Sequence, residues 1–298
     1  MQHHRTAPLF AFLPIVLVAC QDYSLKNGKD EKDGAGSTDT AIDSTGSTDS
    51  NDSTDSDETG EVLDSTDTGD DSDTGSSTDT GDSGEVATEA VYLNTSSELY
   101  SYDTATNAAV LIAPFTSGGW PLTDVVDIAI DLSGHMFGTT FAALYSVNPT
   151  TAECTYIADV AESLTGLTFV SDGRLVGAGS SVSFVDTTTG ALTPLLGSGR
   201  WSTSGDIIGL PDGKLYWTVY GDGSGDELIQ IDPNTGNAVD IGSTGTASIW
   251  GLGYAAGAMI GFTDGGKVID IDPATAMGSN YRTTGSSWWG ATTNPVLW

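Results

Sequence analysis

The stretch Leu228-Ile-Gln-Ile-Asp-Pro-Asn-Thr-Gly236 decides the fold, because four related stretches occur elsewhere in the same chain. Each has alternating apolar residues that run into an Asp/Asn-x-x-Thr turn. Successive turns lie 45, 38, 46 and 40 residues apart. A repeat of about 40 to 50 residues with several short strands per unit is typical of a β-propeller. The five turns begin at Asp103, Asn148, Asp186, Asp232 and Asp272.

Around this stretch, residues 206–241 form one unit of four short antiparallel strands. Turn residues such as Asp-Gly and Pro-Asn-Thr-Gly separate segments in which apolar residues alternate with polar ones. The aspartates of these turns are expected to accept hydrogen bonds from their own backbone. The same four-strand order fits residues 124–160, 164–196 and 249–284.

The two ends of the repeat region complement each other. Residues 91–115 supply only three strands, and residues 289–295 supply one further candidate for an inner strand. Pairing the two ends would close a ring and remove the exposed edges of an open sheet. We therefore predict an all-β, five-bladed propeller over residues 91–298, with a six-bladed ring as the alternative.

The pattern Gly-Leu…Asp-Gly…Leu-Tyr…Ile-Asp-Pro-x-Thr-Gly resembles that of the NHL/YVTN/WD40-like repeat propellers, which include lipoproteins of environmental bacteria. The resemblance covers about residues 91–298. It implies the fold and leaves the function open, since propellers support binders, hydrolases, lyases and oxidoreductases alike.

Residues 1–20 have the pattern of an export signal, with a weakly basic start and an apolar run too short to span a bilayer. The run ends in Leu17-Val-Ala-Cys20, which resembles the lipobox of bacterial lipoproteins. This resemblance implies cleavage before Cys20 and lipidation of that cysteine, and Gln21 differs from the Asp that favours inner-membrane retention. We expect a lipid anchor at the outer membrane or cell surface. An ordinary signal peptide with a chance cysteine is the alternative.

Residues 21–90 are rich in Ser, Thr, Asp and Gly and contain 21 acidic residues against three lysines. With almost no large apolar side chains, this segment cannot bury enough surface to offset the entropy of ordering. We predict a disordered acidic linker that acts as a spacer. Loose calcium binding and an O-glycosylated stalk are the alternatives.

Charge and cysteine content limit the partners of the propeller region. Residues 91–298 carry 20 acidic and five basic side chains, which argues against nucleic acid. No second apolar stretch of membrane length occurs. If Cys20 is lipidated, Cys154 has no disulfide partner and is expected to be a small buried apolar residue. The predicted propeller is a monomer.

Candidate ligand contacts come from the face that carries the loops between the second and third strands of each blade and between successive blades. We call this the loop face, and the opposite side the turn face. Counting back from the turn glycines places Asp127, Asp206 and Trp250 at equivalent positions, and Trp289 matches them in the shared blade. Aromatic rings and carboxylates around one channel mouth suit sugars or other polar ligands with apolar faces. Packing of these tryptophans in the core or rim is the alternative. Three further tryptophans lie in the loops between blades: Trp120, Trp201 and Trp288.

The longest loop between second and third strands, residues 221–227, is a candidate cation site. Alternating oxygens at Asp222, Ser224 and Asp226, followed by Glu227, could surround Ca²⁺. The loop lacks the distant bidentate glutamate of an EF-hand, and a solvated acidic loop is the alternative.

Signatures of enzymes are scarce in the propeller region. Its one histidine, His135, is expected on the turn face, which disfavours a Ser-His-Asp triad. We therefore predict a lipid-anchored, non-catalytic recognition protein for a polysaccharide, peptide or partner protein. A calcium-dependent hydrolase resembling gluconolactonase-like propellers, with Asp127 and Asp206 near the cation, is one alternative. A structural component of the envelope is another.

Overall fold

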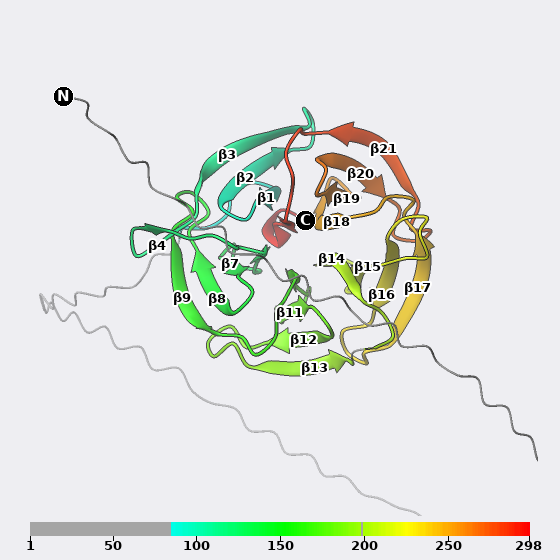
Figure 1. Ribbon diagram of the computed structural model, residues 1–298, viewed down its shortest axis with the longest axis horizontal. Coiled ribbons are helices and arrows are strands. Elements are labelled where there is room, and N and C mark those ends of the chain that lie inside the picture. The colour runs from blue at the N-terminus through cyan, green and yellow to red at the C-terminus, as the bar shows by residue number, and fades with distance from the viewer. Residues whose placement is uncertain (1–84, 198) are drawn as a thin grey trace, which may run out of the picture. The chain divides into compact units, whose positions relative to one another are not determined.

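The computed structural model describes residues 85–197 and 199–298. They form five four-stranded antiparallel sheets arranged around one axis as the blades of a propeller (Figure 1). The predicted leader, Cys20 and residues 21–84 of the predicted linker lie outside the described residues. Within the described part of the chain, no helix has the length and apolar character needed to cross a bilayer.

Blade 1 joins the two ends of the domain. Its outer strands are β1 (Val91–Asn94), β2 (Glu98–Asp103) and β3 (Ala108–Pro114), and its inner strand is β22 (Gly290–Thr293). The register pairs Val91 with Thr293 and Asn94 with Gly290. The predicted closure of the ring is therefore confirmed, and the number of blades is five.

The other four blades follow in chain order, each starting from its inner strand, as the sequence pattern predicts. A small hairpin, β4 (Thr116–Ser117) and β5 (Trp120–Pro121), lies in the loop between blades 1 and 2. Blade 2 contains β6 (Asp127–Ile130), β7 (Met136–Thr139), β8 (Ala143–Val147) and β9 (Cys154–Asp159); blade 3 contains β10 (Gly166–Phe169), β11 (Leu175–Ala178), β12 (Val182–Val185) and β13 (Leu192–Leu196); blade 4 contains β14 (Thr203–Gly209), β15 (Leu215–Val219), β16 (Glu227–Ile231) and β17 (Ala238–Ser243); blade 5 contains β18 (Ile249–Ala255), β19 (Ala258–Thr263), β20 (Lys267–Ile271) and β21 (Gly278–Thr283).

The repeated turns lie on the turn face and have the predicted geometry. The side chain of Asp186 accepts hydrogen bonds from the N–H groups of Thr188 and Thr189 at 2.9 and 2.8 Å. These bonds favour the ionised form and lower the pKa of Asp186. Equivalent bonds stabilise the turns at Asp103, Asn148, Asp232 and Asp272. The aspartates of the repeat thus build turns.

Apolar side chains fill the space between neighbouring blades. Phe115, Ile128 and Met136 form one such cluster between blades 1 and 2. Cys154 belongs to the same cluster and is a free, buried cysteine, as predicted. Burial raises the pKa of its thiol to about 12, so the thiol stays protonated and unreactive.

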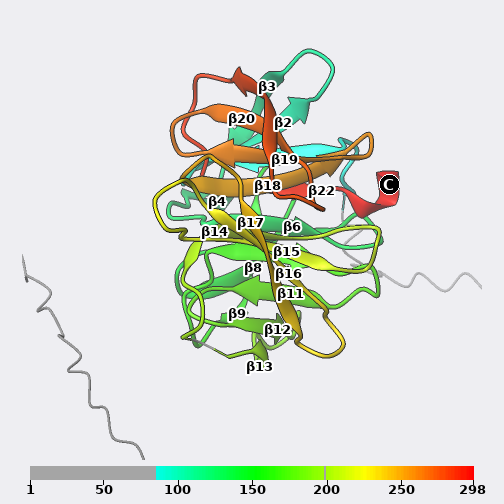
Figure 2. The same cartoon turned by 90° about the vertical axis from the view of Figure 1, so that its right-hand side faces the viewer.

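Both ends of the described domain meet on the turn face. The Ala87 N–H donates a 2.7 Å hydrogen bond to the carbonyl of Gly134 in the β6–β7 turn, and Asn294 Nδ2 donates to the Ala87 carbonyl. The 3₁₀ helix η1 (Pro295–Leu297) follows β22 and protrudes from this face in the side view (Figure 2). Ala87 is buried, so the contacts of the domain begin before the predicted boundary at residue 91.

Candidate functional site

Two buried aspartates connect the inner strands at the axis. Asp127 in β6 and Asp206 in β14 are both completely buried. Asp127 Oδ2 accepts a 2.6 Å hydrogen bond from the Leu167 N–H in β10, and Asp206 Oδ2 accepts one of 2.6 Å from the Leu252 N–H in β18. Each carboxyl group therefore joins its own blade to the next one.

Inner strands need such acceptors because their axial edges have no neighbouring strand. Asp206 accepts from its neighbour Ile207 in addition to Leu252. With the bond from Leu167 to Asp127, the two carboxyl groups bind N–H groups of three of the five inner strands, β10, β14 and β18. The aspartates thus have a structural role that the sequence analysis did not predict.

The surroundings assign the proton of this pair to Asp127. Burial and the negative charge of Asp206 raise the pKa of Asp127, while burial raises the pKa of Asp206. Both oxygens of Asp206 already accept N–H groups. Asp127 Oδ1 has no donor among the described residues, nor does Asn94 Oδ1. A Cβ built on Gly290 would overlap the first of these oxygens and lie 2.6 Å from the second, so both crowd the same point. A proton on Asp127 Oδ1 would remove the repulsion between the two carboxyl groups of the pair.

Three of the inner strands carry glycine at the position of these aspartates. Gly166, Gly251 and Gly290 are the equivalents, and a Cβ on any of them would come within 3.0 Å of a neighbouring inner strand or its carboxyl group. The inner strands are therefore packed too closely for larger residues.

This register corrects the predicted equivalence of Trp250 and Trp289 with the aspartates. The β18–β19 hairpin pairs Ala255 with Ala258 across a two-residue turn, whereas Ile130 pairs with Met136 across a longer one. Counting back from the turn glycine therefore reaches Trp250, one residue before the true equivalent. In blade 1 the equivalent is likewise the residue after Trp289.

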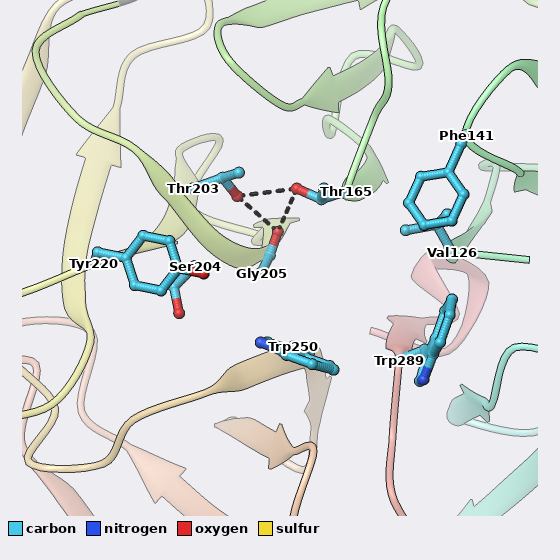
Figure 3. A pocket seen from close by; sticks show the side chains of 9 residues that line it. All are labelled: Val126, Phe141, Thr165, Thr203, Ser204, Gly205, Tyr220, Trp250 and Trp289. Carbon is cyan, nitrogen blue, oxygen red and sulfur yellow. Dashed lines mark hydrogen bonds between the residues drawn. The ribbon is translucent and has the colours of Figure 1, made fainter. Parts of the chain in front are cut away.

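A pocket of about 310 Å³ lies at the axis, on the loop-face side of the inner-strand positions just described. We call it the mouth pocket. Thr165, Gly205, Trp250 and Trp289 directly precede the inner-strand positions just described. The mouth pocket therefore lies above the buried aspartates and opens on the loop face. Figure 3 shows its lining residues, which are Val126, Phe141, Thr165, Thr203, Ser204, Gly205, Tyr220, Trp250 and Trp289.

Aromatic side chains dominate the wall of the mouth pocket. The rings of Phe141 and Trp289 contact each other edge to face with centroids 6.3 Å apart, and Tyr220 lies on the opposite side of Trp250 (Figure 3). Phe141 is 49% exposed and Tyr220 is 65% exposed. Large apolar rings held partly in water around a concave site are typical of ligand contacts.

The structure brings together only part of the predicted set of tryptophans. Trp250 and Trp289 line the mouth pocket. Trp120 is 78% exposed in the β4–β5 hairpin, and Trp201 lies under the guanidinium of Arg200, 4.0 Å from its ring centroid. Trp288 is completely buried and its indole N–H donates to Thr284 at 2.7 Å. These three do not line the pocket.

The two threonine hydroxyl groups of the mouth pocket bond to each other and to a backbone carbonyl. Thr165 Oγ1 and Thr203 Oγ1 lie 3.0 Å apart, and both are 3.0 Å from the Gly205 carbonyl oxygen (Figure 3). The Ser204 hydroxyl is buried and has no hydrogen-bond partner among the described residues. The two threonine hydroxyl groups are therefore occupied by protein partners, and that of Ser204 is not.

The predicted cation loop does not converge on one point. Asp222 Oδ1 bonds to the hydroxyl of Ser224 at 3.1 Å, while Asp226 turns inward and accepts from the Ile249 N–H at 2.8 Å. Burial raises the pKa of Asp226 and also that of Glu227. Among the described residues no group of three or more acidic, His or Cys side chains is placed to hold a metal. Asp226 instead fastens the loop to blade 5.

Sequence reasoning missed Phe141, Tyr220, Thr165 and Thr203. Phe141 and Tyr220 were detectable as large aromatic residues in loops on the loop face, where turn residues were expected. The two threonines carry no such signal, because their place depends on how the strands of blades 3 and 4 approach each other.

No family model matches the sequence, and a search of curated proteins finds no match. Many solved structures resemble the fold at low identity. One from a study of the de novo emergence of a symmetrical protein has a TM-score of 0.48 and 15% identity, covering 70% of this chain and 96% of that one. BamB from Moraxella catarrhalis has a TM-score of 0.38 and 13% identity, covering 66% and 71%. An extracellular domain from B. thetaiotaomicron has a TM-score of 0.40 and 13% identity, covering 65% of this chain and 28% of that one. The propeller class rests on the strand topology of this chain itself.

Proposed function

We propose that this protein is a lipid-anchored binding protein of the bacterial cell envelope, with a non-catalytic propeller that holds a ligand in the mouth pocket. The observation that carries the proposal is the aromatic pocket at the axis, where the repeat is broken by Trp250 and Trp289. The buried aspartates below it are bonded to backbone N–H groups, an arrangement suited to holding strands together rather than to a cation or a reacting group.

The attachment of the chain supports this role. Residues 85–87 meet the domain on the turn face, and the mouth pocket opens on the loop face. A tether that begins at Cys20 would therefore join the domain on the face opposite the pocket and leave the opening of the pocket free.

Replacing either pocket tryptophan is expected to weaken ligand binding while leaving the fold intact. We expect Trp250→Ala and Trp289→Ala each to weaken binding at least about tenfold, because buried aromatic contacts dominate such sites. A glycan and peptide array read with wild-type protein and both variants provides the measurement. Trp120→Ala is the matched control, since it removes an exposed tryptophan outside the pocket.

The same array separates the proposal from its rivals. Binding is expected to survive chelation of calcium. Loss of binding on chelation, or lactone turnover that disappears in Asp206→Asn, would contradict a non-catalytic role. Binding that is unchanged in both pocket variants would place the ligand elsewhere on the domain.

A further inference from the structure

The chemistry of the mouth pocket narrows the class of its ligand. Four aromatic rings, those of Phe141, Tyr220, Trp250 and Trp289, surround the pocket. No charged side chain is among its lining residues. A site of this kind binds through the faces and edges of its rings rather than through ion pairs.

The hydroxyl groups of the pocket are poorly placed for a sugar. Those of Thr165 and Thr203 are engaged with each other and with the Gly205 carbonyl, which leaves the buried Ser204 hydroxyl as the one without a partner among the described residues. A sugar that entered the pocket would leave hydroxyl groups without partners, which is costly in a desolvated site. The pocket therefore favours a ligand group that needs no hydrogen bonds.

The electrostatic surroundings favour a positive charge. The acidic side chains of the loop face outnumber its basic ones, Arg200 and Lys267, and Arg200 is stacked on Trp201. An excess of negative charge on the surface around an opening raises the local concentration of cations. The acidic residues are Glu98, Asp124, Glu162, Asp222, Asp226, Glu227 and Asp264.

We propose that the mouth pocket binds a quaternary ammonium group, the trimethylammonium of a choline-like or betaine-like molecule. Such a group has no N–H to satisfy, carries a diffuse positive charge and is attracted to the faces of tryptophan and tyrosine rings. The cavity of about 310 Å³ is at the small end of ligand sites and suits a headgroup of this size. This inference rests on the proposed function, because it assigns the ligand class of the same pocket.

Isothermal titration of the full-length protein with choline chloride tests the proposal, with 3,3-dimethylbutan-1-ol as the neutral analogue of the same shape. We expect choline to bind about tenfold or more tightly than the neutral analogue. Trp250→Leu is expected to remove the binding of choline, and Trp120→Leu to leave it unchanged. Methyl glucoside is titrated in parallel.

The outcomes distinguish this inference from the proposed function. Equal affinity for choline and its neutral analogue would overturn the ammonium assignment and leave a hydrophobic binding site. Binding of methyl glucoside alone, if it is lost in Trp250→Leu, would also overturn the ammonium assignment and would indicate a sugar site. If no probe or array member binds, both proposals fail.

Two further titrations identify the source of the trimethylammonium group once choline binds. Vesicles of phosphatidylcholine, compared with vesicles of phosphatidylglycerol, present it as a lipid headgroup. A peptide with trimethyllysine, compared with the same peptide with lysine, presents it on a protein. Binding of choline with neither vesicle nor peptide indicates a free small molecule.

Discussion

Asp206→Asn is expected to lower the free energy of unfolding by about 3 kcal/mol, whereas Asp127→Asn leaves it unchanged or raises it. Both oxygens of Asp206 accept backbone N–H groups, from Ile207 and Leu252, so an amide NH₂ would face one of these donors. At Asp127 the new NH₂ can take the place of the protonated Oδ1, which accepts from no donor among the described residues. Urea denaturation of the two variants at neutral pH measures the difference.

The pair also gives stability a dependence on pH. Burial raises the pKa of Asp127 and raises that of Asp206 to about 8, so between about pH 4, where the unfolded residues titrate, and these raised values the folded state binds more protons. Stability therefore falls as the pH rises through this window, by up to about 1.4 kcal/mol per pH unit for each residue. Asp127→Asn removes the contribution of Asp127, so its denaturation midpoint is expected to fall less between pH 5 and pH 8 than that of the wild type. Equal slopes, or equal losses in both asparagine variants, would contradict the assignment of the proton.

Gly290→Ala is expected to lower the free energy of unfolding by about 3 kcal/mol or more, the second large effect. The added Cβ would overlap Asp127 Oδ1 and lie 2.6 Å from Asn94 Oδ1, and neither side chain has room to move because both are completely buried. The strand that closes the ring would be forced away from blade 2. Thermal unfolding followed by circular dichroism measures the loss.

Gly265→Ala is the matched control for this substitution. A Cβ there would be in ordinary contact, 3.9 Å from Thr263 Oγ1. Its stability is expected to change by no more than about 0.5 kcal/mol. If Gly290→Ala is as mild as the control, the inner strands are less closely packed at the axis than described.

The fold could be predicted from the sequence because its signals are local. Alternating apolar residues and Asp/Asn turns define each blade. The extra strand before Asn294 supplies the inner strand that blade 1 lacks ahead of Val91. The hydrogen bonds of Asp186 and its counterparts lie within four residues of chain. Such features can be predicted from the local sequence without knowing which distant residues lie nearby.

The site could be predicted only in part because it depends on contacts between blades. The position of Trp250 at the channel mouth follows from the repeat, and the structure places it in the pocket. The burial of Asp127 and Asp206 follows from how closely the inner strands meet, which depends on the length of the β18–β19 turn and on three glycines. Trp288 and Trp289 are adjacent and of the same residue type, so the sequence does not distinguish them. In the structure the side chain of Trp288 points into the core, whereas that of Trp289 lines the pocket.

The central claim is that the mouth pocket holds the ligand, and the indole N–H signals of the tryptophans test it most directly. In a ¹⁵N–¹H correlation spectrum of the propeller, we expect choline chloride to shift the signals of Trp250 and Trp289. A mixture of neutral saccharides is the second probe. The signals of Trp120, Trp201 and Trp288 are expected to stay in place. Shifts confined to those three, or no shift with either probe, would contradict the assignment of the mouth pocket as the binding site.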